Sequence, residues 1–264
     1  MVALIAGNLN GHEVRVDTSG DPYGPDFWER VFSFRYEPAT QGWLHALLDE
    51  ETDFLDIGAA TGAMTLIGAA LGASVHAYEA SPSHFNLLDR NARMNSNLPG
   101  AIETHLSAVA RTSGTLFFEK GANPEILSDI VFHGLVQNQE KVSMSSLANV
   151  VHRCYAPDRK LIIKMDIEGA EYDIFSSRES LEALLDSSAT LLLAIHPGLM
   201  RLPRTTRVVS RLAWRFANFR RDTRLFRHLS QMDVRFIASG NSVRKHSGAV
   251  ASQLGIHEYI VRFG

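Results

Sequence analysis

The sequence predicts a doubly wound α/β fold with a mostly parallel sheet, and two observations carry this prediction. From residue 53 onward, short apolar strands alternate with helical segments at the spacing of βαβ units. Two of these strands run into turns rich in glycine and carboxylates, as expected at the ligand-binding edge of such a sheet. The chain has 264 residues, 45% of them hydrophobic and 21% charged, so we expect one globular domain with appended segments.

Charge balance and cysteine content exclude several classes of protein. Lys and Arg number 26 against 29 Asp and Glu, and the net charge of -3 gives no support for a generic nucleic-acid binder. The single cysteine excludes a disulfide framework within the chain and fits a reducing compartment. No apolar stretch approaches the roughly 20 residues that span a bilayer, and the apolar start is too short for a signal peptide. We therefore expect a cytoplasmic protein without a transmembrane segment.

Residues 1–50 are expected to form an N-terminal extension of helices and loops, followed by a domain over residues 51–264. The extension contains a strand-like alternation at 13–16 and helical periodicity at 28–34 and 40–48. In the domain, we expect strands at 54–57, 74–79, 102–108, 115–118, 161–165, 190–195, 234–238 and 257–262. The expected helices are 64–71, 82–94, 170–185 and a basic insertion within 200–230. Ser81 is the expected cap of the second helix.

A glycine turn follows the first strand of the domain. Residues 56–63 read Asp-Ile-Gly-Ala-Ala-Thr-Gly-Ala, and glycines at such a place let a ligand approach the main chain. The spacing of Gly58 and Gly62 differs from the Gly-x-Gly-x-x-Gly of a dinucleotide site, and no P-loop motif is present. Glu79 ends the next strand, 21 residues after Gly58, where an acid can accept both ribose hydroxyls of an adenosine group. The combination favours a cofactor site over a tight turn with a surface glutamate.

A second motif, Lys-Met-Asp-Ile-Glu-Gly-Ala-Glu, occupies residues 164–171 after an apolar strand. The strand delivers Asp166 to its carboxyl end, and Glu168 and Glu171 crowd the start of the next helix. Negative groups stabilise a helix N-terminus, so capping and solvation are one interpretation. Crowded carboxylates also raise one another's pKa, and a carboxylate with a raised pKa is better suited to abstract a proton. His196, after the following strand, is another candidate base; an imidazole fixed by a nearby carbonyl is an equally weighted alternative.

The two motifs together resemble the class I S-adenosylmethionine-dependent methyltransferases. The second motif is similar to the Lys-x-Asp-x-Glu-Gly-x-Glu hallmark of the FkbM-like family, and Tyr36-Glu37-Pro38 resembles the segment that precedes the first strand in that family. The resemblance covers roughly residues 30–200 and departs at Ala60 and Ser107, where asparagine is frequent in the family. It implies a Rossmann-like, doubly wound, mostly parallel sheet of seven strands with a final antiparallel strand.

The resemblance implies S-adenosyl-L-methionine as the cofactor and assigns site residues by position. The acid and glycines of the first turn surround the methionine part, Glu79 holds the ribose, and residues at the third strand flank the adenine. The implied cofactor residues are Glu37, Asp56, Gly58, Ala59, Thr61, Gly62, Glu79, Ala80, Ser107, Ala108 and Asp166. For Glu37, helix capping is weighed evenly with covering the cofactor. The catalytic candidates are Asp166, Glu168 and His196.

The resemblance further implies an O-methyltransferase acting on a small-molecule or glycan hydroxyl, with no nucleic-acid partner. A hydroxyl is a poor nucleophile, so a base should take its proton as the new bond forms. The Asn/Asp-Pro-Pro-aromatic pattern associated with nucleobase amine methylation is absent from the sequence. The alternatives are a nitrogen acceptor, a non-catalytic cofactor-binding protein of the same fold, and an NAD-dependent oxidoreductase, which the glycine spacing disfavours.

Two further features concern metals and the acceptor. No metal is expected, because the 11 histidines include no close pair such as His-x-x-x-His. The acids of residues 166–171 alone suggest only a hard cation such as Mg²⁺. Arginines recur at helical spacing between Arg201 and Arg227, which is typical of a solvated helix. The sharper hypothesis is that this segment meets an anionic acceptor such as a phosphorylated sugar.

Overall fold

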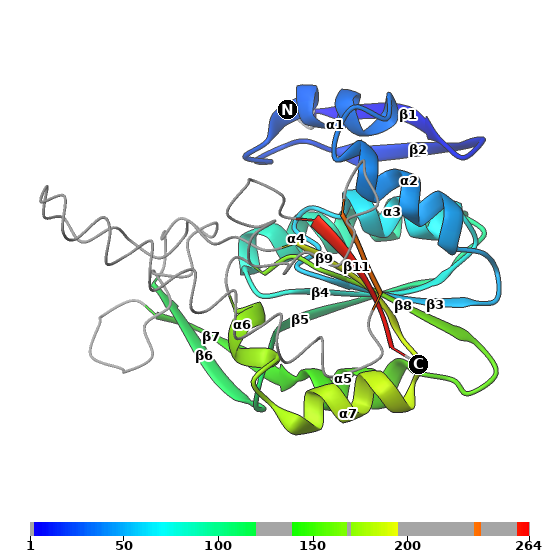
Figure 1. Cartoon of the computed structure of the whole chain (residues 1–264). Helices are drawn as coiled ribbons and strands as arrows, with labels where there is room; N and C mark the ends of the chain where they lie inside the picture. Colours follow the sequence, from blue (N-terminus) through cyan, green and yellow to red (C-terminus); the bar gives the residue numbers. More distant parts are fainter. Residues whose placement is uncertain (1–2, 120–138, 168–169, 195–234, 239–257, 264) are drawn as a thin grey trace, which may run out of the picture. The chain divides into compact units, whose positions relative to one another are not determined.

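The computed structural model describes residues 3–119, 139–167, 170–194, 235–238 and 258–263 (Figure 1). The chain divides into two compact units. The first unit comprises Met1–Val109 and His152–Lys164, and the second comprises Ala110–Val151 and Met165–Gly264. No helix in the described part of the chain is long and apolar enough to cross a membrane.

The first unit begins with an antiparallel hairpin of β1 (Leu4–Leu9) and β2 (His12–Asp17). Helices α1 (Gly24–Phe32) and α2 (Pro38–Leu47) follow it. The sequence predicted β2 and both helices but not β1. Helix α1 also begins four residues earlier than expected, because Pro25 occupies its first turn, where the fixed φ of proline suits a helix.

Four strands form a sheet in the first unit, in the order β8-β3-β4-β5. Their bounds are β3 (Thr52–Ile57), β4 (Ser74–Glu79), β5 (Ile102–Ala110) and β8 (Lys160–Met165). Strand β4 pairs in parallel with both β3 and β5. All residues of β3 and the last five of β8 are buried, which explains why both strands read as nearly continuous apolar runs.

Helices α3 (Ala63–Ala70) and α4 (Pro82–Met94) follow β3 and β4 in the chain, and both pack against β4. Every residue of α3 is buried. Ala77 of β4 and Leu88 of α4 belong to one buried cluster, so the helices cover this face of the strand. The predicted cap of α4 is confirmed, because the Ser81 hydroxyl accepts a hydrogen bond from the backbone N–H of His84.

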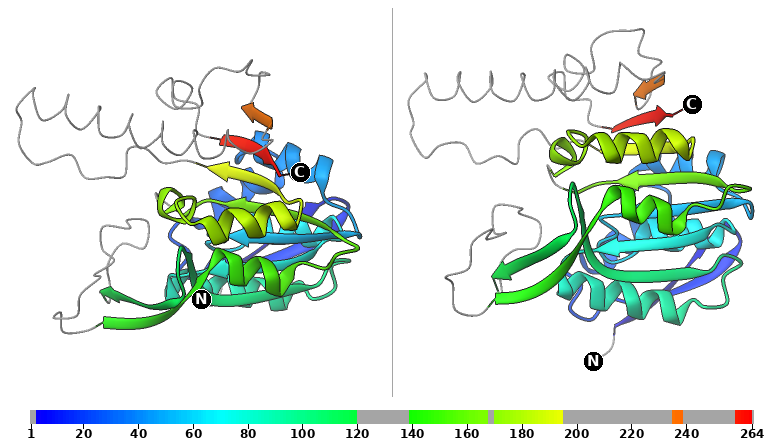
Figure 2. Two further views of the ribbon diagram at one scale, coloured as in Figure 1. Left: turned by 60° about the horizontal axis from the view of Figure 1, so that its bottom comes forward. Right: turned by 90° about the horizontal axis from the view of Figure 1, so that it is seen from below.

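The second unit contains a long antiparallel ribbon of β6 (Gly114–Glu119) and β7 (Gln139–Ser146), visible in both views of Figure 2. Helix α5 (Leu147–Cys154) comes next in the chain, and its residues from His152 onward belong to the first unit. Later elements of the second unit are α6 (Glu171–Ile174), α7 (Arg178–Asp186), β9 (Thr190–Ala194), β10 (Arg235–Ala238) and β11 (Glu258–Arg262). Strand β11 pairs antiparallel with both β9 and β10, so the order there is β10-β11-β9.

The predicted doubly wound α/β fold with a mostly parallel sheet and a final antiparallel strand is confirmed. The described residues contain all eight strands expected after residue 50, one more than the seven that the resemblance implies, and β7 in addition. The sequence interpretation missed β7 and α5, and it ended β5 two residues early. The prediction of a single helix over 170–185 was wrong. The helix is interrupted between α6 and α7, and α7 begins with a new cap, in which the Ser177 hydroxyl accepts a hydrogen bond from the backbone N–H of Ser180.

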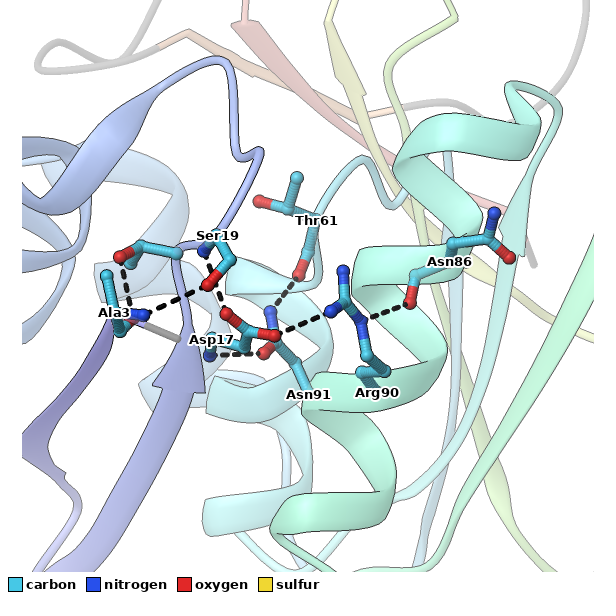
Figure 3. Close-up of polar contacts among 8 residues, drawn as sticks. Ala3, Asp17, Ser19, Thr61, Asn86, Arg90 and Asn91 are labelled. Carbon is cyan, nitrogen blue, oxygen red and sulfur yellow. Dashed lines mark hydrogen bonds and ion pairs between the residues drawn. The ribbon is translucent and has the colours of Figure 1, made fainter. Parts of the chain in front are cut away.

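Side chains of helix α4 form hydrogen bonds both with the N-terminal hairpin and with the turn after β3 (Figure 3). The buried side chain of Asn91 accepts from the backbone N–H of Asp17 at 2.9 Å and donates to the carbonyl of Thr61 at 3.1 Å. Arg90 forms an ion pair with the Asp17 carboxylate at 2.6 Å. Hydrogen bonding to Ser19, helped by the charge of Arg90, holds the pKa of Asp17 below its usual value.

Asn95 repeats this arrangement one helical turn later. Its amide donates to the carbonyl of Arg15 at 2.7 Å, and its carbonyl accepts from the backbone N–H of Arg15 at 2.9 Å. The side chain therefore satisfies the two main-chain groups of Arg15 much as a neighbouring strand would. Asn91 of α4 and Asn95 at its C-cap thus bind alternate residues of β2.

The turn between β3 and α3 holds an alanine in the left-handed backbone region. Gly58 and Gly62 have φ of 82° and 101°, and between them Ala60 has φ of 49°. Glycine adopts such angles freely, whereas a side chain with a Cβ atom crowds the following carbonyl. Asparagine tolerates this region better than most residues, which is consistent with asparagine being frequent at this position in the family that the sequence resembles.

We expect Asn91→Ala to lower the free energy of unfolding by about 2 kcal/mol, because it leaves the Asp17 N–H and the Thr61 carbonyl without their buried partner. Urea denaturation followed by circular dichroism measures the change. Asn86→Ala, an exposed position on the same helix, is the matched control and should change the value by less than about 0.5 kcal/mol. Equal stability of the two variants would show that the Asn91 bonds contribute nothing.

We expect Ala60→Asn to raise the free energy of unfolding by up to about 1 kcal/mol, since it relieves strain at a positive φ. Ala60→Val should lower it, because a β-branched side chain tolerates this region poorly. Thermal unfolding monitored by calorimetry compares the three proteins. A valine variant as stable as the asparagine variant would contradict the strain argument.

Candidate functional site

The carboxylate of Glu79 lies buried at the end of β4, against the turn that follows β3. Its Oε2 accepts from the backbone N–H of Ala60 at 2.9 Å, and its Oε1 accepts from the backbone N–H of Ser81 at 2.7 Å. Only 8% of the residue is exposed. Burial raises the pKa of Glu79 to about 7; its backbone hydrogen bonds oppose this shift and the nearby charge of Asp56 adds to it.

Asp56 is the second acid of this site and comes from β3. It is fully buried, and its Oδ2 accepts from the Thr65 hydroxyl of α3 at 2.6 Å. This bond ties the end of β3 to the helix on the far side of the turn. Asp56 and Glu79 are therefore carried by neighbouring parallel strands, as the sequence predicted.

The turn itself is anchored by the main chain of β4. The backbone N–H groups of Gly58 and Ala59 both donate to the carbonyl of Tyr78, at 3.0 and 3.1 Å. The hydroxyl of Thr61 is buried, and among the described residues its Oγ1 has no hydrogen-bond partner. A buried hydroxyl without a partner carries a free-energy cost that a bound ligand can remove, so this atom is available for a hydrogen bond to a ligand.

Three of the remaining cofactor candidates lie on β5 or next to Glu79. Leu106 of β5 pairs with Glu79, so Ser107 and Ala108 extend past the end of β4. Both residues lie inside β5 rather than after it, because the strand continues to Ala110. Ser107 is buried and Ala108 is half-buried, while Ala80 directly follows Glu79 and is also half-buried.

Glu37 occupies the N-cap position of α2 with a φ of 39°. Its side chain makes no capping hydrogen bond; the helix instead uses the Glu37 carbonyl, which accepts from the backbone N–H of Gln41. The capping interpretation of this carboxylate therefore gains no support.

The second motif is described only in part. Asp166 directly follows β8 and is half-buried, and Glu171 is the fully buried first residue of α6. Glu168 and His196 lie outside the described residues, as does the arginine-rich segment 201–227. Their predicted roles stay predictions.

Sequence reasoning missed the support of the turn by Thr65 and Asn91. Thr65 holds Asp56, and Asn91 holds the Thr61 carbonyl. The available signal was the pair Asn91 and Asn95, whose spacing of four residues puts two amides on the same buried side of α4 and its C-cap as Leu88.

Comparison with solved structures gives distant likenesses. The chain is similar to an rRNA methylase from Streptococcus thermophilus at 13% identity and a TM-score of 0.41, over 84% of this chain and 92% of that one. It is similar to P. horikoshii TYW2 in complex with MeSAdo at 12% identity and a TM-score of 0.41, over 99% of this chain and 71% of that one. It is also similar to the Pyrococcus abyssi tRNA (uracil-54, C5)-methyltransferase in complex with S-adenosyl-L-homocysteine. The identity is 10% and the TM-score 0.40, and the match covers 99% of this chain and 44% of that one. Likenesses this weak carry no argument about the substrate, and no curated protein matches the chain.

Residues 56–196 match the Methyltransferase FkbM domain, more than half of the 264 residues. The match begins at Asp56 of the first motif and ends at His196, so it contains the glycine turn, Glu79 and Asp166. Methyltransferases of this family use S-adenosylmethionine as the methyl donor. The chain therefore belongs to the FkbM family of S-adenosylmethionine-dependent methyltransferases.

Proposed function

We propose that the protein transfers a methyl group from S-adenosylmethionine to a hydroxyl of a sugar or natural-product acceptor. The observation that carries the proposal is Asp166, a half-buried carboxylate directly after β8 within the FkbM domain. The absence of an Asn/Asp-Pro-Pro-aromatic pattern from the sequence also favours oxygen over nitrogen as the acceptor atom.

S-adenosylmethionine, when bound, supplies a methyl group activated by a sulfonium. The acceptor oxygen bonds to the methyl carbon as the carbon–sulfur bond breaks, and the hydroxyl proton must go to a base. We infer that Asp166 takes this proton. Glu168 and His196 are further candidates, and an anionic acceptor would be met by the segment 201–227.

The residues of the glycine turn fit the cofactor. Each oxygen of the Glu79 carboxylate already accepts one backbone hydrogen bond, and a carboxylate oxygen has a second lone pair that a ribose hydroxyl can use. The buried hydroxyl of Thr61 offers a further contact. We infer that Glu79 holds the ribose and that the turn from Asp56 to Gly62 surrounds the methionine part.

A methyl-transfer screen tests the acceptor class. The purified chain is incubated with S-adenosylmethionine and deoxysugar nucleotides, glycolipids or polyketide alcohols, each paired with its amino analogue, and the products are analysed by mass spectrometry. We expect methylation of a hydroxyl compound and none of its amino analogue. Transfer to the amine alone would overturn the choice of oxygen.

We predict that affinity for S-adenosylhomocysteine falls about tenfold for each pH unit below about 7, because the ionised form of Glu79 accepts the ribose hydrogen bonds. The stability of the free protein should change in the opposite sense. A carboxyl whose pKa is raised from 4.5 in the unfolded chain to about 7 in the folded one costs stability as pH rises through that window. Calorimetric titration and urea denaturation at pH 5 to 8 measure the two quantities.

Glu79→Gln is the control for this prediction. The glutamine cannot ionise, so the variant should bind S-adenosylhomocysteine weakly and with little dependence on pH between 5 and 8. If wild-type affinity does not change over this range, or if the variant retains the same pH dependence, Glu79 does not hold the ribose.

We predict that Asp166→Asn lowers kcat by about 10²- to 10⁴-fold, the usual contribution of a general base, while the affinity for S-adenosylhomocysteine changes less than about threefold. Asp173→Asn removes an exposed acid a few residues further along the chain and should change neither quantity. Steady-state kinetics and calorimetry separate the two effects. Full turnover in Asp166→Asn would assign the proton to another group.

A further inference from the structure

Two histidines and a glutamate converge on one face of strands β4 and β5. His76 pairs with Glu103 across the parallel ladder, and Tyr78 pairs with His105. Residues two apart in a strand point to the same face, so these four side chains share it. It is the face opposite to Ala77, which packs with Leu88 of α4.

The three titratable side chains approach each other at metal-ligand distances. The Nδ1 atom of His76 lies 3.3 Å from one carboxylate oxygen of Glu103, and the Nε2 atom of His105 lies 3.6 Å from the other. One ligand atom from each residue fits within 4.8 Å of the other two. Bonds of about 2.0–2.1 Å at tetrahedral angles separate ligand atoms by about 3.3 Å, so little movement would be needed to close the set around an ion.

The two ring nitrogens that face Glu103 are buried, and within the described part of the chain neither makes a hydrogen bond. The side chain of His76 is 18% exposed and that of His105 is 13% exposed, whereas Glu103 is 63% exposed. Two nitrogen lone pairs thus meet a carboxylate that remains open to solvent, which gives an ion a route to the site.

Packing fixes the orientation of the imidazoles. The ring of His105 stacks on Tyr78 with centroids 4.3 Å apart, and the rings of His76 and His105 lie nearly parallel at 5.8 Å. The site is therefore organised before any ligand arrives.

We propose that His76, Glu103 and His105 bind a divalent transition metal of the zinc type, with water at the fourth position. Two imidazoles and one carboxylate form a ligand set that zinc accepts, whereas Mg²⁺ prefers oxygen ligands. The expectation of no metal came from searching for close histidine pairs along the sequence. His76 and His105 are 29 residues apart and meet only because parallel strand pairing brings Glu103 opposite His76.

Calorimetric titration of Zn²⁺ into the untagged full chain, previously treated with a chelator and dialysed, tests the proposal. We expect one equivalent of Zn²⁺ to bind and Mg²⁺ not to compete. Glu103→Gln changes an exposed side chain, so it should fold normally and weaken Zn²⁺ binding by more than about 100-fold, beyond the loss caused by removing an outer-shell partner. His45→Gln, an exposed histidine of α2, is the matched control and should bind Zn²⁺ like the wild type.

Co²⁺ provides a spectroscopic test of the ligand set. Bound Co²⁺ should give the visible absorption of a tetrahedral site without a thiolate charge-transfer band, and the signal should disappear in His105→Gln. A thiolate band would assign the metal to Cys154 and overturn the proposal. So would the absence of Zn²⁺ binding, or equal binding by Glu103→Gln and the wild type. Glu103→Gln should keep its affinity for S-adenosylhomocysteine, so this outcome is independent of the methyltransferase assignment.

Discussion

The buried carboxylate of Glu79 is the interaction on which the glycine turn depends. The turn must present backbone N–H groups and a left-handed Ala60 at the end of a sheet, and the bond from the Ala60 N–H to Glu79 holds that conformation. The same carboxylate accepts from Ser81, the cap of α4. One acid therefore fixes the end of β4, the turn after β3 and the start of a helix, and its raised pKa is the electrostatic cost of that position.

Helix α4 carries this constraint to the N-terminal hairpin. It begins at Ser81 beside Glu79, and three turns later Asn91 binds the Thr61 carbonyl. Two successive residues of the turn are thus held from separate elements: Ala60 by Glu79 at the end of β4, and Thr61 by Asn91 near the C-terminal end of α4. Asn91 also binds β2. We therefore infer that the hairpin stabilises the conformation of the turn, in addition to its part in the hydrophobic core.

Local patterns predicted much of the fold because the central strands are buried on both faces. Strand β3 and the helix cap at Ser81 follow directly from such patterns. The bonds of Asn91 could not be predicted, since its partners lie 74 and 30 residues away in the chain. Helix α5 does have buried residues at helical spacing, but the aperiodic segment before it hid the signal. The position of Glu79 at the end of β4, beside the turn, could be predicted because its distance from the turn in the chain reflects the βαβ geometry.

Strand alternation lets β4 serve two separate sites. Ala77 and Glu79 face α3, α4 and the turn, whereas His76 and Tyr78 face His105 on the opposite side. A metal bound by His76 would bridge β4 to β5 without touching the turn, because the backbone lies between the two faces. The carboxylate of Glu103 is therefore a probe of the metal site alone, since it approaches the two histidines from β5 on the face opposite to the turn.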